Sequence, residues 1–222
     1  MEVVSDIICP FAQRVIGVLE LKGVDYEIER ISLGDKPDWF LKASPNAQVP
    51  ILIEDRGVLF ESSPICEYLD EVYCEPRLHP QDPFKRAQHR AWVELAAKNY
   101  LVQCPTMRSP TVEIFEERKA KLLTAFEKIE KVLAEGPYFD GSRLSMVDPA
   151  WHPLLYRAAL VEKHTGFDFL SAFPKAKTWQ QELMKVDALA RSVSSEDFEK
   201  AFVGFYLNDQ TYLGRLMGEK AA

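Results

Sequence analysis

The chain has 222 residues, 47% of them hydrophobic, which is enough to bury the core of one large domain or two small ones. Its 27 Lys and Arg residues are outnumbered by 34 Asp and Glu residues, so the net charge of -7 provides no broad positive field for nucleic acid or anionic lipid. No apolar run approaches the roughly 20 residues of a membrane-spanning helix, and no basic, apolar leader follows Met1. We therefore expect a globular, cytoplasmic protein without a nucleic-acid or membrane partner.

The first third of the sequence alternates the signals of strands and helices. In chain order it predicts a short strand at Val3-Val4, a helix with an apolar stripe from Phe11 to Leu21 that ends at Gly23, and a half-buried strand over 26–33. A short segment around Trp39 follows. The last predicted elements are strands over 50–54 and 58–60 that flank a turn, and a helix over 62–73. The first three elements form a strand-helix-strand unit, for which a right-handed crossover is expected. The full order, β-α-β-α-β-β-α, is typical of a thioredoxin-like α/β domain.

The pattern changes in the middle of the chain. Residues 75–84 contain three prolines and no periodic stripe, which is typical of a linker. Every long segment that follows has a helical pattern, and the pairs Asp82-Pro83 and Ser109-Pro110 each predict a capping residue before a proline in the first turn of a helix. We therefore predict a thioredoxin-like domain over residues 1–74, a linker over 75–84 and an all-α domain over 85–222.

One of the four cysteines, Cys9, stands before Pro10 at the start of a predicted helix. Unpaired backbone N–H groups and the positive end of the helix dipole favour a thiolate there, and they can lower the pKa of a thiol from about 8.5 to roughly 3.5–7.5. Such a thiol attacks disulfides at neutral pH, and we expect it to titrate below the other three. The alternative is a buried, inert cysteine, the commoner role of a free cysteine, so the Cys-Pro pair by itself leaves both open.

The other three cysteines and the four histidines give no comparable signal. Cys104-Pro105 repeats the Cys-Pro pair but follows a helical stretch, and Cys66 and Cys74 lie within and at the end of a predicted helix, so we interpret all three as structural. The spacing of Cys and His residues fits neither a disulfide framework nor a metal site. We expect reduced thiols and no metal cofactor.

Two later segments complement the thiol. Val49-Pro50 directly precedes a predicted strand, where a cis bond would turn the backbone of Val49 toward an extended peptide ligand; the alternative is an ordinary proline that starts a strand. Ser62 can offer its hydroxyl and backbone N–H to a carboxylate while Glu61 attracts an amino group; the alternative here is a plain N-cap serine. A thiol, a peptide-pairing edge and a clamp for an α-amino acid together suit glutathione.

With these motifs the sequence resembles the omega class of glutathione transferases over nearly its whole length. The shared motifs are Cys9-Pro10-Phe11-Ala12 with Arg14, Lys36-Pro37-Asp38-Trp39-Phe40, Val49-Pro50, Glu61-Ser62, Cys66-Glu67-Tyr68-Leu69-Asp70-Glu71 and Ser145-Met146-Val147-Asp148. The resemblance implies the glutathione transferase fold, an α/β thioredoxin-like domain followed by an all-α domain, and a homodimer. The sequence departs from the family pattern at Gln13, where a glutamate is common, and at Pro64, which replaces an aliphatic residue.

The resemblance also implies a role for each site residue. Cys9 is the expected catalytic residue, which forms a mixed disulfide with glutathione, and the expected glutathione site consists of Phe11, Lys36, Val49, Pro50, Glu61 and Ser62. In the family, the matching lysine meets the glycine carboxylate, the valine pairs with the cysteinyl backbone, and the Glu-Ser pair holds the γ-glutamyl end. Phe198 and Tyr206 fall near positions where the family places aromatic side chains over the second substrate.

Ala12 stands where a dithiol motif would have its second cysteine, so Cys9 has no resolving partner within the motif. We therefore predict a monothiol cycle of glutathione-dependent thiol transfer or reduction. The substrates that the resemblance implies are glutathionylated proteins, dehydroascorbate and S-glutathionyl ketones. One alternative is a glutathione lyase that removes glutathione from aromatic thioethers. Another is a non-catalytic docking module on the same fold, against which intact Cys9, Lys36 and Glu61-Ser62 argue.

Overall fold

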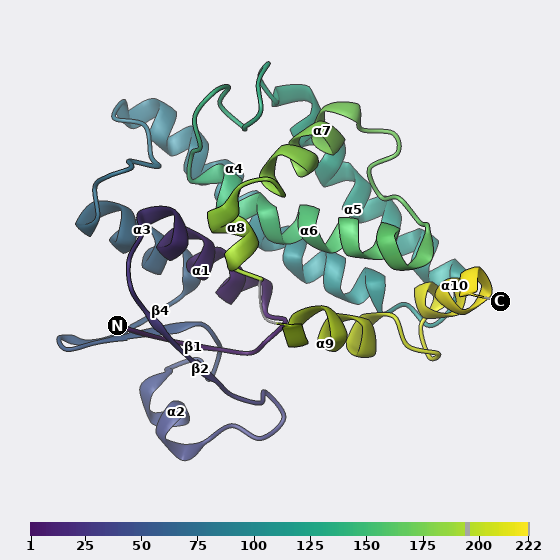
Figure 1. Ribbon diagram of the computed structural model, residues 1–222, viewed down its shortest axis with the longest axis horizontal. Helices are drawn as coiled ribbons and strands as arrows, with labels where there is room; N and C mark the ends of the chain where they lie inside the picture. Colours follow the sequence, from purple (N-terminus) through teal and green to yellow (C-terminus); the bar gives the residue numbers. More distant parts are fainter. Residues whose placement is uncertain (194–195, 222) are drawn as a thin grey trace.

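A four-stranded sheet forms the N-terminal part of the protein (Figure 1). The computed structural model describes residues 1–193 and 196–221. The strands are β1 (Glu2–Ser5), β2 (Glu27–Arg30), β3 (Ile51–Glu54) and β4 (Gly57–Phe60), in the spatial order β2-β1-β3-β4. Strands β1 and β2 are parallel and joined through helix α1 (Pro10–Lys22), whereas β3 and β4 form an antiparallel hairpin that pairs with β1. The predicted thioredoxin-like order is confirmed.

The two faces of the sheet bury different residues, because consecutive side chains of a strand point to opposite sides. Val3 belongs to the main core with apolar residues of α1 and α3 (Ser62–Val72), while Val4 packs with Phe40 of α2 (Asp38–Ala43). Accordingly, Figure 1 shows α1 and α3 on one side of the sheet and α2 on the other. Cys9 packs against the smaller cluster, so the thiol lies on the side of the sheet that α2 covers.

The sequence prediction is wrong for the second strand. A half-buried strand is expected over 26–33, but β2 spans only Glu27–Arg30 and all four of its residues are exposed. The reason is its position, because β2 is an edge strand with a neighbour on one side only. Burial resumes at Ile31, which is 7% exposed and packs with the cluster on the α2 side. Alternation along a strand shows which residues share a face, but not whether another layer covers that face.

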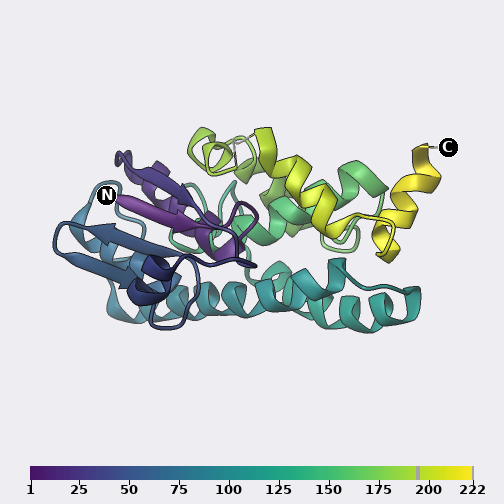
Figure 2. The same ribbon diagram turned by 90° about the horizontal axis from the view of Figure 1, so that it is seen from below.

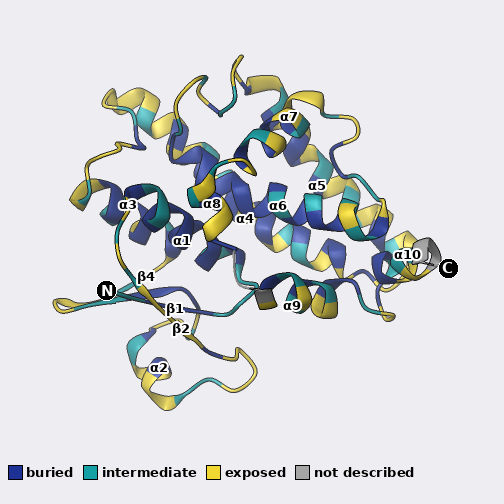
Figure 3. Cartoon of the chain, in the orientation of Figure 1, coloured by how far each residue is buried: buried dark blue, intermediate teal, exposed yellow. Residues whose placement is uncertain are grey.

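The rest of the described chain is helical, as predicted. The helices are α4 (Pro83–Met107), α5 (Val112–Val132), α6 (Val147–Thr165), α7 (Pro174–Leu183), α8 (Asp187–Arg191), α9 (Glu196–Tyr206) and α10 (Tyr212–Ala221). Helix α6 packs against both α1 and α4, so it connects the sheet to the helical part. Figure 2 shows α9 and α10 on the side opposite α4 and α5, and Figure 3 shows buried residues concentrated on α1, α4 and α6. Within residues 1–193 and 196–221, no helix combines the length and apolar composition that crossing a lipid bilayer requires.

Local caps determine where several helices begin and end. Gly23 ends α1 in the left-handed conformation with a φ of 62°, and the Asp82 side chain accepts a hydrogen bond from a first-turn N–H of α4 at 2.8 Å, both as predicted. The predicted cap at Ser109 is wrong. Its hydroxyl donates to a carbonyl in the last turn of α4, and Thr111 caps α5 instead. The domain boundaries at 74 and 84 stay predictions.

Candidate active site

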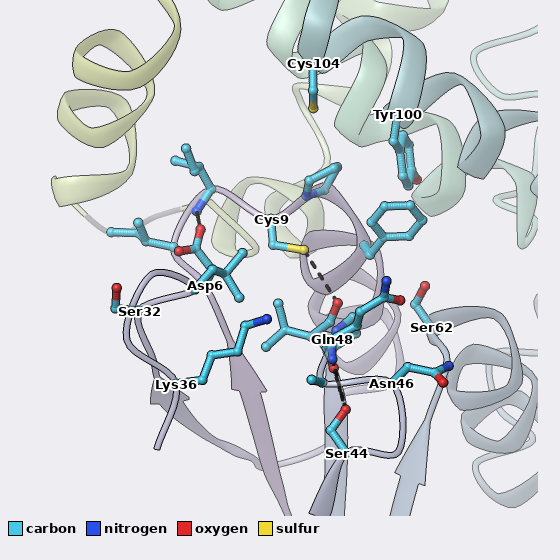
Figure 4. A pocket seen from close by; sticks show the side chains of 18 of the residues that line it. Asp6, Cys9, Ser32, Lys36, Ser44, Asn46, Gln48, Ser62, Tyr100 and Cys104 are labelled. Carbon is cyan, nitrogen blue, oxygen red and sulfur yellow. Dashed lines mark hydrogen bonds between the residues drawn. The ribbon is translucent and has the colours of Figure 1, made fainter. Parts of the chain in front are cut away.

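A cavity of about 830 Å³ opens between the sheet and helices α4 and α9. Its walls come from the loops that precede α1, α2 and β3, from the start of α3, and from α4 and α9. All residues of the predicted glutathione site line it: Cys9, Phe11, Lys36, Val49, Pro50, Glu61 and Ser62. Figure 4 shows Cys9, Lys36 and Ser62 around the cavity, with Tyr100 and Cys104 on the wall formed by α4. The fold thus brings together the predicted glutathione-site residues, which come from four separate segments of the sequence.

Cys9 is the N-cap of α1, and Pro10 occupies the first turn. The first N–H groups of a helix have no partner within the helix, so they are available to a negative group at this end. The thiol donates a weak hydrogen bond to the carbonyl oxygen of Val49, with Sγ and O 3.9 Å apart. The sulfur therefore lies between a helix N-terminus and the loop that precedes β3.

The pKa of Cys9 differs from the sequence prediction. Burial raises the pKa of the thiol to about 11, although the N–H groups of Ala12 and Phe11 and the guanidinium of Arg157 act to lower it. The effect of the helix N-terminus is present, but it is weaker than the desolvation of the thiolate. Burial likewise raises the pKa of the Cys66 thiol, to about 12. Cys9 differs from Cys66 because it keeps partial exposure and lines the cavity, so polar groups of a ligand can shift this balance.

The loop that precedes β3 has the backbone that the sequence interpretation requires. The Val49-Pro50 peptide bond is cis. The preceding residue, Gln48, is held by Ser44, whose hydroxyl donates to the Gln48 carbonyl at 3.0 Å and accepts from the Gln48 N–H at 3.0 Å. Val49 lines the cavity beside Cys9, so an extended ligand can lie along the backbone of this loop.

The start of α3 differs from a plain N-cap serine. Glu61 is the N-cap, with a left-handed φ of 67°, and Ser62 is the first residue of the helix. One guanidinium nitrogen of Arg14 donates to the Ser62 hydroxyl oxygen at 2.5 Å and to the Ser63 hydroxyl oxygen at 3.0 Å. The Ser62 hydroxyl keeps its own proton to donate. The side-chain amide of Asn46 donates to the Glu61 carboxylate at 2.9 Å, so a donor group and an acceptor group lie side by side at this wall.

A cation and an aromatic pair complete the part of the cavity nearest the sheet. Figure 4 shows the Lys36 side chain extending into the cavity. The ring of Phe11 meets that of Tyr100 edge to face, with the centroids 5.0 Å apart, so a side chain at the start of α1 packs directly on α4. No group of three metal-ligating side chains comes together among the described residues, and all four cysteines are unpaired. The reactive groups that line the cavity are therefore two thiols, Cys9 and Cys104, together with hydroxyls, carboxylates and an ammonium group.

The two residues predicted for the second substrate lie in different places. Tyr206 lines the cavity, and its hydroxyl donates to Sγ of Cys104 at 3.2 Å. Phe198 is not among the lining residues; it is 3% exposed, and its ring packs against that of Tyr156. Sequence reasoning missed the residues that complete this wall, which are Tyr100, Leu101, Cys104, Ala201 and Phe205. Their spacing of three or four residues on α4 and on α9 is the signal that indicates one helix face.

Two family models match the chain. Residues 8–72 match the model described as "Glutathione S-transferase, N-terminal domain", and residues 112–181 match "Glutathione S-transferase, C-terminal domain". The first match contains the thiol and the start of α3, and the second contains α5, α6 and most of α7. The chain therefore belongs to the glutathione S-transferase family.

Within this family the chain is similar to the omega class. It is 35% identical over 205 residues to glutathione S-transferase omega-1 of Sus scrofa, and the alignment covers 90% of this chain and 83% of that relative. The crystal structure of glutathione transferase Omega 3C from Trametes versicolor superposes with a TM-score of 0.76 at 25% identity, over 86% of this chain and 87% of that one. Rice GST1, solved in complex with glutathione, has the same fold, with a TM-score of 0.81 at 23% identity over 98% and 96% of the two chains. The predicted class and fold are confirmed, and the omega-class relatives support a glutathione-dependent transferase.

Proposed function

We propose that this protein is a glutathione-dependent thiol transferase or reductase whose nucleophile is Cys9. The observation that carries the proposal is the position of the thiol, which lines the cavity at the N-terminus of α1 and beside Val49 in the loop that precedes β3. Ala12 carries no thiol, so no second cysteine of the motif can resolve a disulfide. A monothiol cycle with glutathione is the simplest chemistry for this arrangement.

The polar groups around Cys9 suit glutathione in one direction. Its γ-glutamyl end carries a carboxylate and an amino group, which suit the Ser62 donors and the Glu61 carboxylate respectively. The extended cysteinyl backbone suits the backbone of Val49, and the glycine carboxylate suits the ammonium group of Lys36. In this orientation the glutathione thiol lies toward Cys9.

The cycle consumes one glutathione for each glutathionyl mixed disulfide. The thiolate of Cys9 attacks the glutathionyl sulfur, the original S–S bond breaks, and the other thiolate leaves and takes up a proton. Cys9 then carries glutathione through a new S–S bond. The thiolate of a second glutathione attacks this bond, which releases oxidised glutathione and restores the thiolate of Cys9.

The second substrate meets the more apolar wall formed by Leu101, Cys104, Phe205 and Tyr206. The proposed substrates are glutathionylated proteins, dehydroascorbate and S-glutathionyl ketones. For the last two, oxidation of glutathione to its disulfide supplies the two electrons of the reduction. A homodimer and a cytoplasmic location remain part of the proposal.

The test compares the wild type with Cys9→Ser, and with Cys74→Ser as a control at an exposed cysteine outside the cavity wall. Exposure to oxidised glutathione should give one glutathionyl adduct, mapped by mass spectrometry to Cys9. Cys9→Ser should still bind glutathione in calorimetry, while reduction of a small glutathione mixed disulfide falls by orders of magnitude, because a serine hydroxyl is a weak substitute for a thiolate. Cys74→Ser should behave as the wild type. Full reductase activity in Cys9→Ser would refute the proposal. If the wild type cleaved an aromatic thioether faster than the disulfide, the result would favour the lyase. If the wild type bound glutathione but turned over neither substrate, the result would favour a docking module.

A further inference from the structure

Arg157 of α6 is a buried cation close to the nucleophile. The residue is 0% exposed, and no described carboxylate forms an ion pair with it. Its guanidinium donates to the Ile8 carbonyl at 2.7 Å, to Oε1 of Gln13 at 2.5 Å and to the Pro153 carbonyl at 3.0 Å. All three acceptors are neutral, so these hydrogen bonds leave the positive charge uncompensated.

The contact with Ile8 brings this charge to the peptide that precedes Cys9. The Ile8 carbonyl belongs to the peptide unit that joins it to Cys9, so the guanidinium bonds the backbone immediately before the thiol. The Nε atom of Arg157 is buried without a hydrogen-bond partner, and the ring of Phe198 lies 5.7 Å from the guanidinium carbon. A buried cation with no anion beside it is unfavourable, because the lost hydration is not offset by a counter-ion.

The neutral side chain of Gln13 keeps this charge uncompensated. Gln13 is 3% exposed; its Oε1 accepts from Arg157, and its Nε2 lies 3.4 Å from Nδ1 of His152. Burial and the charge of Arg157 lower the pKa of His152 to about 3, so the imidazole is neutral and its Nδ1 accepts from the amide. Both ends of the Gln13 amide are therefore assigned, and no carboxylate is present at the position where one would neutralise Arg157.

We propose that Arg157 is a positioning residue that stabilises the thiolate of Cys9, and that the neutral Gln13 keeps its charge available for this purpose. The inference rests on the proposed role of Cys9 as the nucleophile. Burial disfavours the thiolate, and a fixed positive charge in the same low-dielectric surroundings offsets part of that penalty. The thiolate is in turn the counter-ion that Arg157 lacks.

Other charged or titratable groups also face Cys9 or line the cavity. They are Asp6, Arg30, Lys36, Glu61, Tyr100, Cys104 and Tyr206. The Asp6 carboxylate raises the pKa of the thiol, and the two tyrosines are neutral phenols because burial raises their pKa. Arg157 differs from Arg30 and Lys36 because it is completely buried, so water and salt screen its charge least.

Gln13→Glu tests the inference by placing one carboxylate beside Arg157 in a side chain of the same shape. Above pH 7 the neutral His152 can hold its proton on Nδ1 and donate to the second oxygen, so the variant keeps the contacts at both ends and adds one negative charge. Gln13→Met is the matched control, because it removes the hydrogen bonds without adding a charge. Iodoacetamide labelling rates of Cys9 are measured from pH 7 to 11 by peptide mass spectrometry, with exposed Cys74 as the internal standard.

We expect Gln13→Glu to raise the apparent pKa of Cys9 by about one unit. Below that pKa, Cys9 should then be labelled about tenfold more slowly than in the wild type, while the labelling rate of Cys74 stays the same. Gln13→Met should change the rate by less than about threefold. Arg157→Met should slow labelling as Gln13→Glu does, and Arg157→Lys, which keeps the charge, should restore most of the rate. A labelling profile of Gln13→Glu that equals that of the wild type or of Gln13→Met would overturn the inference, as would equal profiles for Arg157→Met and Arg157→Lys.

The labelling experiment uses no substrate, so its result does not depend on the proposed function. A shifted profile in Gln13→Glu supports the role of Arg157 even if Cys9→Ser retains reductase activity. An enzyme that depends on Cys9 but shows an unshifted profile overturns the role of Arg157 alone.

Discussion

Replacement of His152 by Gln tests the buried polar network behind Cys9 through the pH dependence of stability. His152 is 2% exposed, and burial together with the charge of Arg157 lowers its pKa to about 3. In the unfolded chain a histidine has a pKa of about 6.5. As the pH falls below that value, the unfolded state binds a proton that the folded state does not, so the unfolding free energy decreases until the pH approaches about 3.

The magnitude follows from these two pKa values. Each pH unit between them corresponds to about 1.4 kcal/mol, and because the titration begins gradually near pH 6.5, the change between about pH 7 and pH 5 amounts to about 2 kcal/mol. His152→Gln keeps a side chain that can accept the hydrogen bond of Gln13 but cannot titrate, so this contribution should vanish. His89, whose pKa is also lowered by burial, remains in both proteins and cancels in the comparison.

Urea unfolding followed by circular dichroism at pH 5, 7 and 8 provides the measurement. The wild type should lose about 2 kcal/mol more than His152→Gln between pH 7 and 5, whereas both proteins should change equally between pH 7 and 8, where His152 is neutral in both states. If the two proteins lost the same stability between pH 7 and 5, His152 would not be held neutral by burial, and the assignment of the Gln13 amide would fail with it.

Two further substitutions address the glutathione site and the helical part. Lys36→Ala should weaken glutathione binding by about 1–3 kcal/mol in calorimetry, the scale of a charge-assisted hydrogen bond, whereas Lys36→Arg should keep most of the affinity; an alanine variant that binds as the wild type would remove Lys36 from the site. Asp148→Ala should lower the unfolding free energy by about 2–4 kcal/mol, because the substitution removes a buried carboxylate that accepts three hydrogen bonds. The donors are the N–H groups of Phe139 at 2.9 Å and Ser145 at 2.7 Å and the Trp179 indole at 2.8 Å. A loss below about 1 kcal/mol in denaturant unfolding would contradict that role.

Helix α1 illustrates what can be predicted from neighbouring residues. Pro10 fits the first turn because a proline needs no hydrogen bond for its nitrogen there, and Gly23 ends the helix because it adopts a positive φ without strain. The cause of each boundary lies within a few positions of the chain. The order of strands and helices, and the place of Cys9 at a helix start, are therefore predictable from the sequence.

Helix α9 illustrates what the pattern leaves open. Phe198, Phe202 and Tyr206 recur at intervals of four and form a buried stripe. Tyr206 of this stripe lines the cavity, as does Phe205, which is 43% exposed, whereas Phe198 does not. Periodicity identifies the stripe that faces the core, and Phe198 lies inside it. Which residue at the border of the stripe meets the cavity depends on how α9 packs over the rest of the protein, so the choice between Phe198 and Phe205 required the structure.

The thioredoxin-like order, the all-α second part, the thiol at a helix N-terminus and the missing second cysteine at Ala12 are predictable from the sequence, because each depends on residues that are close in the chain. The charge and the solvation around that thiol depend instead on how distant segments pack. Arg157 reaches Ile8 and Gln13 from 149 and 144 positions away. Burial at Cys9 outweighs the helix N-terminus that local sequence indicates. Desolvation and Coulomb interactions depend on distances in space, and those distances exist only once α6 packs against α1.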